Sequence, residues 1–144
     1  MTIVEQVSHE AGSFRRDTIT LGWEDRRQGH GKRRSDGGVE FAISLPNGTV
    51  LKGGDCLLLR EEGIAVVVRE AEEPVYVIKP KTRQEWAFYA YQIGNRHQSV
   101  MIGERELMCL QNPAVKSLFD QLHVRYEKDV RPFTAALATI GHSH

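Results

Sequence analysis

The stretch that decides the fold is Val75–His97, VYVIKPKTRQEWAFYAYQIGNRH. Its first residues, Val75 to Lys79, are apolar and mostly β-branched, which predicts a short strand. Thr82-Arg83-Gln84-Glu85 matches a capping box, in which the threonine hydroxyl and the glutamate carboxylate each accept a free backbone N–H. Gly94-Asn95 predicts the end of the helix, because both residues tolerate the left-handed conformation of a C-terminal cap. The apolar residues between these signals recur at helical spacing and predict the buried face: Trp86, Ala87, Ala90 and Tyr91.

The residues that follow predict two further strands, a helix and a last strand. The strands Ser99–Ile102 and Glu106–Leu110 flank a turn, and Asn112-Pro113 provides a cap and a first-turn proline for the second helix. Val124–Val130 alternates as the last strand. The order βαββαβ predicts an α+β ferredoxin-like domain, in which two helices cover one face of a four-stranded antiparallel sheet. The buried face of the second helix would contain Val115, Leu118, Phe119 and Leu122.

The chain before Arg69 has the pattern of strands and tight turns, without helical periodicity. Four segments predict strands: Asp17–Trp23, Val39–Leu45, Cys56–Leu59 and Ile64–Val68. The fold class is therefore mixed, with an all-β N-terminal domain before the ferredoxin-like one. We expect a β-rich partner-binding domain at 1–70, a linker at 71–74, a ferredoxin-like metal-binding domain at 75–134 and a flexible histidine-containing tail at 135–144.

Composition and charge exclude several classes of protein. The 144 residues include 19 Lys or Arg and 19 Asp or Glu, so the formal net charge of zero favours neither nucleic acid nor a membrane surface. No apolar run approaches the length of a membrane span, and the first residues, MTIVEQVSHE, lack the features of a secretory signal. Cys56 and Cys109 each lie in an apolar run, which predicts buried free thiols in a reducing compartment. We expect a cytoplasmic protein.

Motifs of common enzymes and of thiolate metal carriers are absent from the sequence. It contains neither Gly-x-Ser-x-Gly nor His-Glu-x-x-His, and it has no Cys-x-x-Cys pair. Gly31-Lys32 does not complete a phosphate-binding loop, since Arg26 and Arg33 stand where glycine and a hydroxyl residue are needed. The predicted central strands carry no aromatic pair for stacking RNA bases, which disfavours an RNA-binding domain. We expect no enzyme, and imidazole is the available metal ligand.

Among the six histidines, three are candidate ligands. His97 follows the first helix in a predicted loop that displays its side chain; the alternative is a surface histidine without a role. His142 and His144 close the chain and can chelate nickel, copper or zinc; the alternatives are a tail without function or the remnant of a purification tag. His123 lies at a helix end, where the dipole favours a cation, and is expected to be structural. His30 lies in the basic segment Arg26–Arg34, which would bind phosphate or an acidic partner, or form a solvated loop.

Four stretches of the sequence together resemble the UreE family of urease accessory proteins. They are Tyr91–His97 (YQIGNRH), Met101-Ile102, Leu118–Leu122 (LFDQL) and Leu45–Asp55 (LPNGTVLKGGD). The resemblance covers nearly the whole chain, from about Thr18 to His144. It implies a β-rich domain for partner contact, a ferredoxin-like metal-binding domain, and a homodimer in which His97 of each protomer faces its mate.

The resemblance further implies a nickel-binding metallochaperone that carries Ni²⁺ to the dinuclear centre of urease. Its partners would be a second copy, the urease apoprotein complex and the accessory GTPase, and Zn²⁺ or Cu²⁺ would compete for the same site. The expected ligands are His97, His142 and His144. Ser99 stands where the family often has proline, so we expect a less rigid loop. The alternative is a protein-interaction adaptor of the urease maturation complex, whose β-rich domain contacts an acidic partner through Arg26–Arg34 and whose metal binding is incidental.

Overall fold

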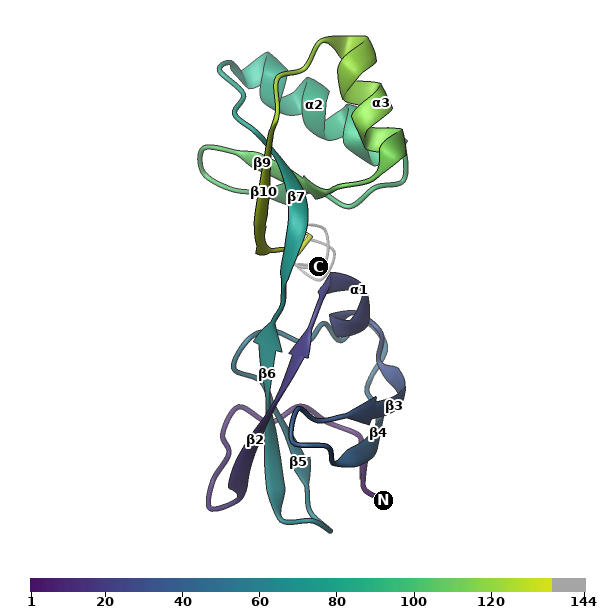
Figure 1. The fold of residues 1–144 in the computed structure, drawn as a ribbon, viewed down its shortest axis with the longest axis vertical. Coiled ribbons are helices and arrows are strands. Elements are labelled where there is room, and N and C mark those ends of the chain that lie inside the picture. Colours follow the sequence, from purple (N-terminus) through teal and green to yellow (C-terminus); the bar gives the residue numbers. More distant parts are fainter. Residues whose placement is uncertain (136–144) are drawn as a thin grey trace. The chain divides into compact units, whose positions relative to one another are not determined.

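A computed structural model describes residues 1–135 of the chain as a mixed α/β protein (Figure 1). It divides into two compact units, Met1–Ala71 and a second unit that begins at Glu72. Strand β6 (Ile64–Glu70) ends the first unit and β7 (Glu72–Ile78) begins the second, so that only Ala71 lies between them. Residues 72–74 therefore belong to a strand, whereas we expected them in a linker. They pair with β10 (Glu127–Pro132), and this pairing supplies the hydrogen-bond partners that a linker would lack.

The first unit contains two three-stranded sheets. One has the order β1-β4-β3 and consists of β1 (Ile3–Val4), β4 (Glu40–Ser44) and β3 (His30–Arg34). The other has the order β2-β6-β5, with β2 (Arg15–Leu21) parallel to β6 and β5 (Cys56–Leu59) antiparallel to it. Strands β5 and β6 lie where the apolar runs predict them, and Gly63, with φ of +70°, lies in the turn between them.

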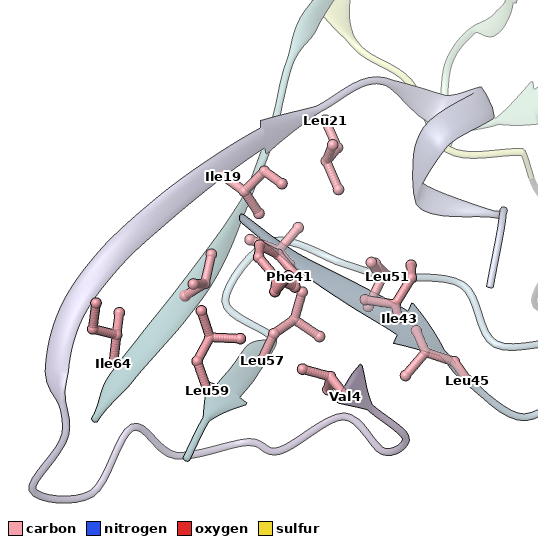
Figure 2. Packing of buried hydrophobic residues seen from close by; sticks show 12 residues of the cluster. Val4, Ile19, Leu21, Phe41, Ile43, Leu45, Leu51, Leu57, Leu59 and Ile64 are labelled. Carbon is pink, nitrogen blue, oxygen red and sulfur yellow. The ribbon is translucent and has the colours of Figure 1, made fainter. Parts of the chain in front are cut away.

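Apolar side chains from both sheets form one core in the first unit. Phe41 of β4 and Leu57 of β5 are buried, and Ile19 of β2 joins them (Figure 2). On β4, and at the end of β2, the buried residues alternate with more exposed ones, as expected for sheets that pack face to face. Strand β5 is buried along most of its length. Burial of this apolar surface is the main force that holds the two sheets together.

Three elements of the first unit were not predicted. Strand β1 has two residues, too few to show an alternation of apolar and polar residues. Strand β3 is made of the basic residues that we expected in a loop. The third is α1 (Trp23–Arg26), a single helical turn. The all-β N-terminal domain that we expected therefore contains one short helix. Arg26, the last residue of α1, accounts for this helical turn. Its side chain is fully buried, and its guanidinium donates to the carbonyl oxygens of Leu21 at 3.2 Å and Leu51 at 3.4 Å.

The second unit has one four-stranded sheet and two helices. Along the chain, β7 is followed by α2 (Arg83–Asn95), β8 (Met101–Ile102), β9 (Leu107–Leu110), α3 (Pro113–Leu122) and β10. The sheet order is β10-β7-β9-β8, and every neighbouring pair is antiparallel. Both helices pack against the sheet face that carries Tyr76, Ile78, Leu107 and Cys109. Within residues 1–135, no helix is long and apolar enough to cross a lipid bilayer.

The predicted buried face is confirmed for α3 and is wrong in part for α2. Helix α3 buries Val115, Leu118 and Phe119, as predicted, and Leu122 packs partly against the same core. Helix α2 is rotated from the prediction, since its core face consists of Trp86, Tyr89, Ala90 and Ile93. Tyr91 and Ala87, which we expected to be buried, are exposed. The prediction failed because α2 carries apolar residues on both of its faces, so the spacing alone allows either face to be the buried one.

Candidate metal site

The position of His97 is set by the helix that precedes it, and that helix begins where the sequence predicts. Thr82 is the N-cap of α2, and its hydroxyl oxygen accepts from the backbone N–H of Glu85 at 3.1 Å. The carboxylate of Glu85 accepts from the backbone N–H of Lys81 at 2.7 Å, one residue earlier than in the capping-box pattern. These bonds satisfy two backbone donors at the helix start and fix where α2 begins.

The end of α2 differs from the prediction. Gly94 and Asn95 remain helical, Arg96 is the C-cap, and the left-handed residue is His97, with φ of +59°. The backbone N–H of His97 donates to the carbonyl oxygen of Gly94 at 2.9 Å. The N–H of Gln98 donates to the carbonyl oxygen of Ile93 at 3.3 Å. This pair of bonds is the Schellman motif, and His97 occupies its left-handed position, which is usually glycine.

A histidine at this position carries backbone strain. For a residue with a Cβ the left-handed conformation costs about 1 kcal/mol, although histidine tolerates it better than β-branched residues do. Strained backbone of this kind persists only where the surrounding structure holds it, and it concentrates at functional sites. The left-handed conformation of His97 is therefore compatible with a functional role, but it does not by itself mark a ligand, because His123 adopts the same conformation.

The surroundings of His97 are anchored on both sides. Ile93 precedes it at 0% exposure, and Val100 follows it at 7%. The side-chain amide of Asn112, the N-cap of α3, donates to the side-chain oxygen of Gln98 at 3.0 Å. The loop is thus tied to α3 next to His97. The expectation that Ser99 makes the loop less rigid stays a prediction. The side chain of His97 is exposed on the surface.

An apolar patch lies on α2 ahead of His97. Phe88 is 45% exposed and Tyr91 is 64% exposed, and their spacing of three residues places them on the same face of the helix. Neither side chain belongs to the core of the second unit. The sequence signal for this patch was the number of aromatic residues in α2, of which we had assigned Tyr91 to the buried face and had given Phe88 no role. We call Phe88 and Tyr91 the aromatic patch of α2.

The described residues do not bring the predicted ligands together. His142 and His144 lie outside residues 1–135. Within that range, no three side chains of His, Cys, Asp or Glu form a group that would hold a metal ion. His97 is therefore a single imidazole on the described surface of one chain. Tight binding of a transition metal requires several such ligands, so the remaining ones have to come from the tail or from another molecule.

His123 is the second histidine in a left-handed conformation, with φ of +56° at the C-cap of α3. The helix end is closed by the backbone N–H of Val124, which donates to the carbonyl oxygen of Phe119 at 2.9 Å. His123 also borders a cavity of about 820 Å³ whose lining includes the cations Lys81 and Arg125 and the carboxylates Glu85 and Glu127. Among the described residues, these groups do not form a cluster that would hold a metal ion. The structural role that we expected for His123 stays a prediction.

The histidines of the first unit each have at most one other polar side chain within 4 Å of the ring nitrogen. His30 lies at the start of the exposed strand β3, where its Nδ1 is 3.4 Å from the hydroxyl oxygen of Ser44. His9 is almost fully exposed, and its Nδ1 is 3.9 Å from a carboxylate oxygen of Asp55. One imidazole with one carboxylate or hydroxyl is too small a donor set for a closed metal site. The geometry therefore leaves His97 as the strongest candidate among the described residues.

Comparison with known protein families gives matches over almost the whole chain. Residues 2–69 match the model described as "UreE urease accessory protein, N-terminal domain". Residues 73–144 match the model described as "UreE urease accessory protein, C-terminal domain". The two matches meet at residues 70–72, where the two compact units of the structure also divide.

Curated relatives agree with these matches. The chain is 31% identical over 144 residues to the urease accessory protein UreE of Lysinibacillus sphaericus (strain C3-41), covering 99% of this chain and 97% of the relative. It is 33% identical over 134 residues to UreE of Chelativorans sp. (strain BNC1), covering 89% and 84%. It is 36% identical over 110 residues to UreE of Staphylococcus saprophyticus, covering 76% and 73%.

Proposed function

Because the chain belongs to the UreE family of urease accessory proteins, we propose that it is a metallochaperone that binds Ni²⁺ through His97 and carries it to urease. Membership of the family, which the sequence motifs suggested, gives a role in urease maturation. The family is one of accessory proteins, not of enzymes. What we propose beyond membership of the family is the metal that the chain carries, the residues that bind the metal and the proteins that receive it.

The observation that carries the proposal is the placement of His97. It is an exposed imidazole on a loop that a Schellman motif, the buried Ile93 and the Asn112–Gln98 bond hold in place. Imidazole nitrogen is a suitable ligand for nickel, copper and zinc. A ligand on a fixed loop keeps its position while the other ligands exchange, and a carrier needs such exchange in order to release its cargo.

A homodimer would supply the second ligand. In a two-fold symmetric dimer the same surface meets itself, so a residue near the axis is presented by both chains. The aromatic patch of α2 supports this arrangement, because Phe88 and Tyr91 are large apolar side chains left exposed on the helix that leads to His97. Pairing of two α2 helices through this patch would bury the aromatic side chains and place two imidazoles near each other.

The tail histidines complete the proposed ligand set. His142 and His144 would add movable imidazoles to the His97 pair, with one or two ions bound per dimer. Copper binds nitrogen sites more tightly than nickel does, and zinc competes too. Selection for nickel would therefore rest on which metal the cell makes available and on recognition of the partners, the urease apoprotein complex and the accessory GTPase.

We propose a separate role for each of the two units, metal binding for the second and partner contact for the first. We assign the second unit to the ferredoxin-like class, which is supported by the sheet order β10-β7-β9-β8 with both helices packed on one face. The first unit would contact the partners. We propose a cytoplasmic location, which is supported by the two buried free cysteines, Cys56 and Cys109.

A calorimetric nickel titration, with sedimentation of the same samples, tests the proposal. We expect tight binding of about one ion per dimer in the intact protein. His97→Ala should lose that binding while the dimer persists, because His97 belongs to the metal site and not to the aromatic patch. Equal binding in both proteins would refute the role of His97 and favour the adaptor function. Binding that disappears together with the dimer would show only that the variant fails to assemble.

A further inference from the structure

Strand β3 presents a free backbone edge in the first unit. It is the outer strand of the sheet β1-β4-β3, and its only strand partner within residues 1–135 is β4. The backbone N–H of Ser35 donates to the carbonyl oxygen of Val39, and that of Leu45 donates to Gly29. Backbone groups alternate in direction along a strand, so Gly29, Gly31, Arg33 and Ser35 face β4. The N–H and C=O groups of His30, Lys32 and Arg34 therefore point away from the sheet.

The same edge carries a concentration of positive charge. The side chains of Lys32 and Arg34 are exposed, and those of His30, Lys32 and Arg34 extend from the same face of the strand, because alternate residues share a face. The Arg33 guanidinium bends back along the strand and donates to the carbonyl oxygens of Lys32 at 2.8 Å and Gln28 at 3.4 Å. It thereby brings a third full cation to the edge. Its Nε is buried, whereas the second N–H of each terminal nitrogen remains able to bind a carboxylate.

Nearby acidic groups offset this charge only in part. Glu40 lies opposite Arg34 in the ladder with β4. Asp36 follows the strand, but its carboxylate accepts from the hydroxyls of Thr18 at 2.7 Å and Thr20 at 3.3 Å, and its backbone N–H donates to Thr18. The free edge therefore ends at Arg34, where the chain turns towards β2. Three cations remain beside outward backbone groups, with one carboxylate directly opposite.

We infer that the free edge of β3 binds an extended acidic segment of a partner protein, which adds to the sheet β1-β4-β3 as a further strand. Main-chain hydrogen bonds to the outward N–H groups of Lys32 and Arg34 would hold the segment. The carbonyl oxygen of Lys32 already accepts from the Arg33 guanidinium, and its second lone pair can accept a bond from the added strand. Charges on an edge strand repel another copy of the same edge and so prevent aggregation. They attract a segment with carboxylates at alternate positions, because complementary charge selects the partner.

An NMR titration of the full-length protein with a blocked synthetic peptide, Val-Glu-Val-Glu-Val-Glu-Val, tests the inference. We expect the amide signals of Lys32 and Arg34 to shift and their hydrogen exchange to slow. A peptide with lysine in place of glutamate should not bind. A glutamate peptide with alternate N-methylated amides keeps its charge but cannot complete the ladder, and its binding should weaken at least tenfold. If the N-methylated peptide binds as tightly as the unmodified one, the contact is electrostatic only and the inference is wrong.

Charge-reversal variants locate the site. Lys32→Glu with Arg34→Glu should weaken peptide binding at least tenfold, whereas Lys128→Glu, on the outer strand β10 of the other unit, should leave it unchanged. An absence of amide shifts, or shifts confined to residues outside β3 and its neighbour β4, would overturn the inference. So would tighter binding of a single-stranded oligonucleotide at the same amides, since a basic strand can also contact phosphates. Nickel binding by the double variant should be normal, because the inference does not rest on the proposed carrier function.

Discussion

The backbone N–H of His97 donates to the carbonyl oxygen of Gly94 at 2.9 Å, so the candidate metal ligand is also part of the C-terminal cap of α2. Two requirements meet at this position. The cap favours a residue without a side chain, because φ is +59°, whereas metal binding needs the imidazole. If His97 is the proposed ligand, a histidine at this position would sacrifice some stability for metal binding, and substitutions there would separate the two roles.

His97→Gly should abolish tight nickel binding without destabilising the fold. Glycine adopts the left-handed conformation without strain, although it gains freedom in the unfolded chain. We expect a free energy of unfolding equal to that of the wild type or up to about 1 kcal/mol higher, and His97→Ala should show no such gain. Urea denaturation of the metal-free proteins measures the difference. A glycine variant clearly less stable than the alanine variant would contradict the left-handed backbone at His97.

Tyr91→Asp should dissociate the proposed dimer. The substitution would place two like charges at the centre of the interface, where each would lose its hydration. We expect a monomer by analytical ultracentrifugation, with an unchanged far-UV circular dichroism spectrum because Tyr91 is 64% exposed. Val130→Asp is the matched control, since Val130 is 54% exposed on β10, outside the aromatic patch. A dimer that survives Tyr91→Asp would place the interface elsewhere.

Nickel uptake should weaken as the pH falls. Only neutral imidazole coordinates a metal, and free imidazole has a pKa of about 6.5, so protons compete with nickel below that pH. We expect the affinity to decrease progressively between about pH 7 and pH 5, with proton release on binding detectable in buffers of different ionisation enthalpy. An affinity that stays constant over this range would argue against histidine ligands.

Cys109 should resist alkylation in the folded protein. Its side chain is fully buried in β9, and burial raises the pKa of its thiol to about 12. The thiolate is the reactive form, so at pH 8 only about one thiol in ten thousand would be reactive even if the reagent could reach it. Labelling with iodoacetamide and mass spectrometry should modify Cys109 only in denaturant. Rapid modification under native conditions would show that the core of the second unit opens readily.

Asp17→Asn should destabilise the first unit, and the effect should depend on pH. A hydrogen bond with the Ser35 side chain and others from the backbone N–H groups of Thr18 and Gly37 lower the pKa of Asp17, while partial burial opposes this shift. A carboxylate with a lowered pKa stabilises the fold above its unfolded pKa, and that contribution is lost as the pH falls through the folded value. We expect a loss of about 1 kcal/mol at pH 7.

The measurement for Asp17→Asn is thermal or urea unfolding at several pH values. The difference from wild type should shrink below about pH 4, because Asp17 is then increasingly protonated in the unfolded wild-type chain and subsequently in the folded one. Glu62→Gln is a useful comparison, since the hydrogen bond from the Thr2 hydroxyl lowers the pKa of Glu62 in the same unit. A deficit for Asp17→Asn that is constant from pH 7 to pH 3 would mean that ionisation of Asp17 does not contribute.

Sequence patterns predicted those elements whose signals are local. The start of α3 is an example: Asn112 accepts from the backbone N–H of Val115 at 2.9 Å and Pro113 takes the first turn, as their side-chain chemistry dictates. The strands β5 and β6 were likewise marked by apolar runs and an intervening glycine. In each case the residues that decide the structure are neighbours in the chain.

Sequence patterns did not predict the features that depend on contacts between residues far apart in the chain. Strand β3 forms because β4 lies beside it, and nothing within His30–Arg34 favours a strand on its own. The rotation of α2 is decided by the fit of Trp86 and Ile93 against the sheet, which local spacing does not encode. At the candidate site, the motif predicted His97 as a ligand, which stays a prediction. The left-handed backbone was expected at Gly94 and Asn95, because glycine and asparagine are the usual residues there, and it lies at His97 instead.

The pairing of β2 and β5 with the same strand, β6, has a consequence for synthesis of the protein on the ribosome. Strand β6 is the last strand of the first unit, and it is the central strand of its sheet. The sheet β2-β6-β5 therefore cannot assemble until residues 64–70 have left the exit tunnel, although most of the unit has by then emerged. Until that moment the apolar residues of β2 and β5 lack their partner, so the nascent chain is most exposed to misfolding just before its first unit is complete.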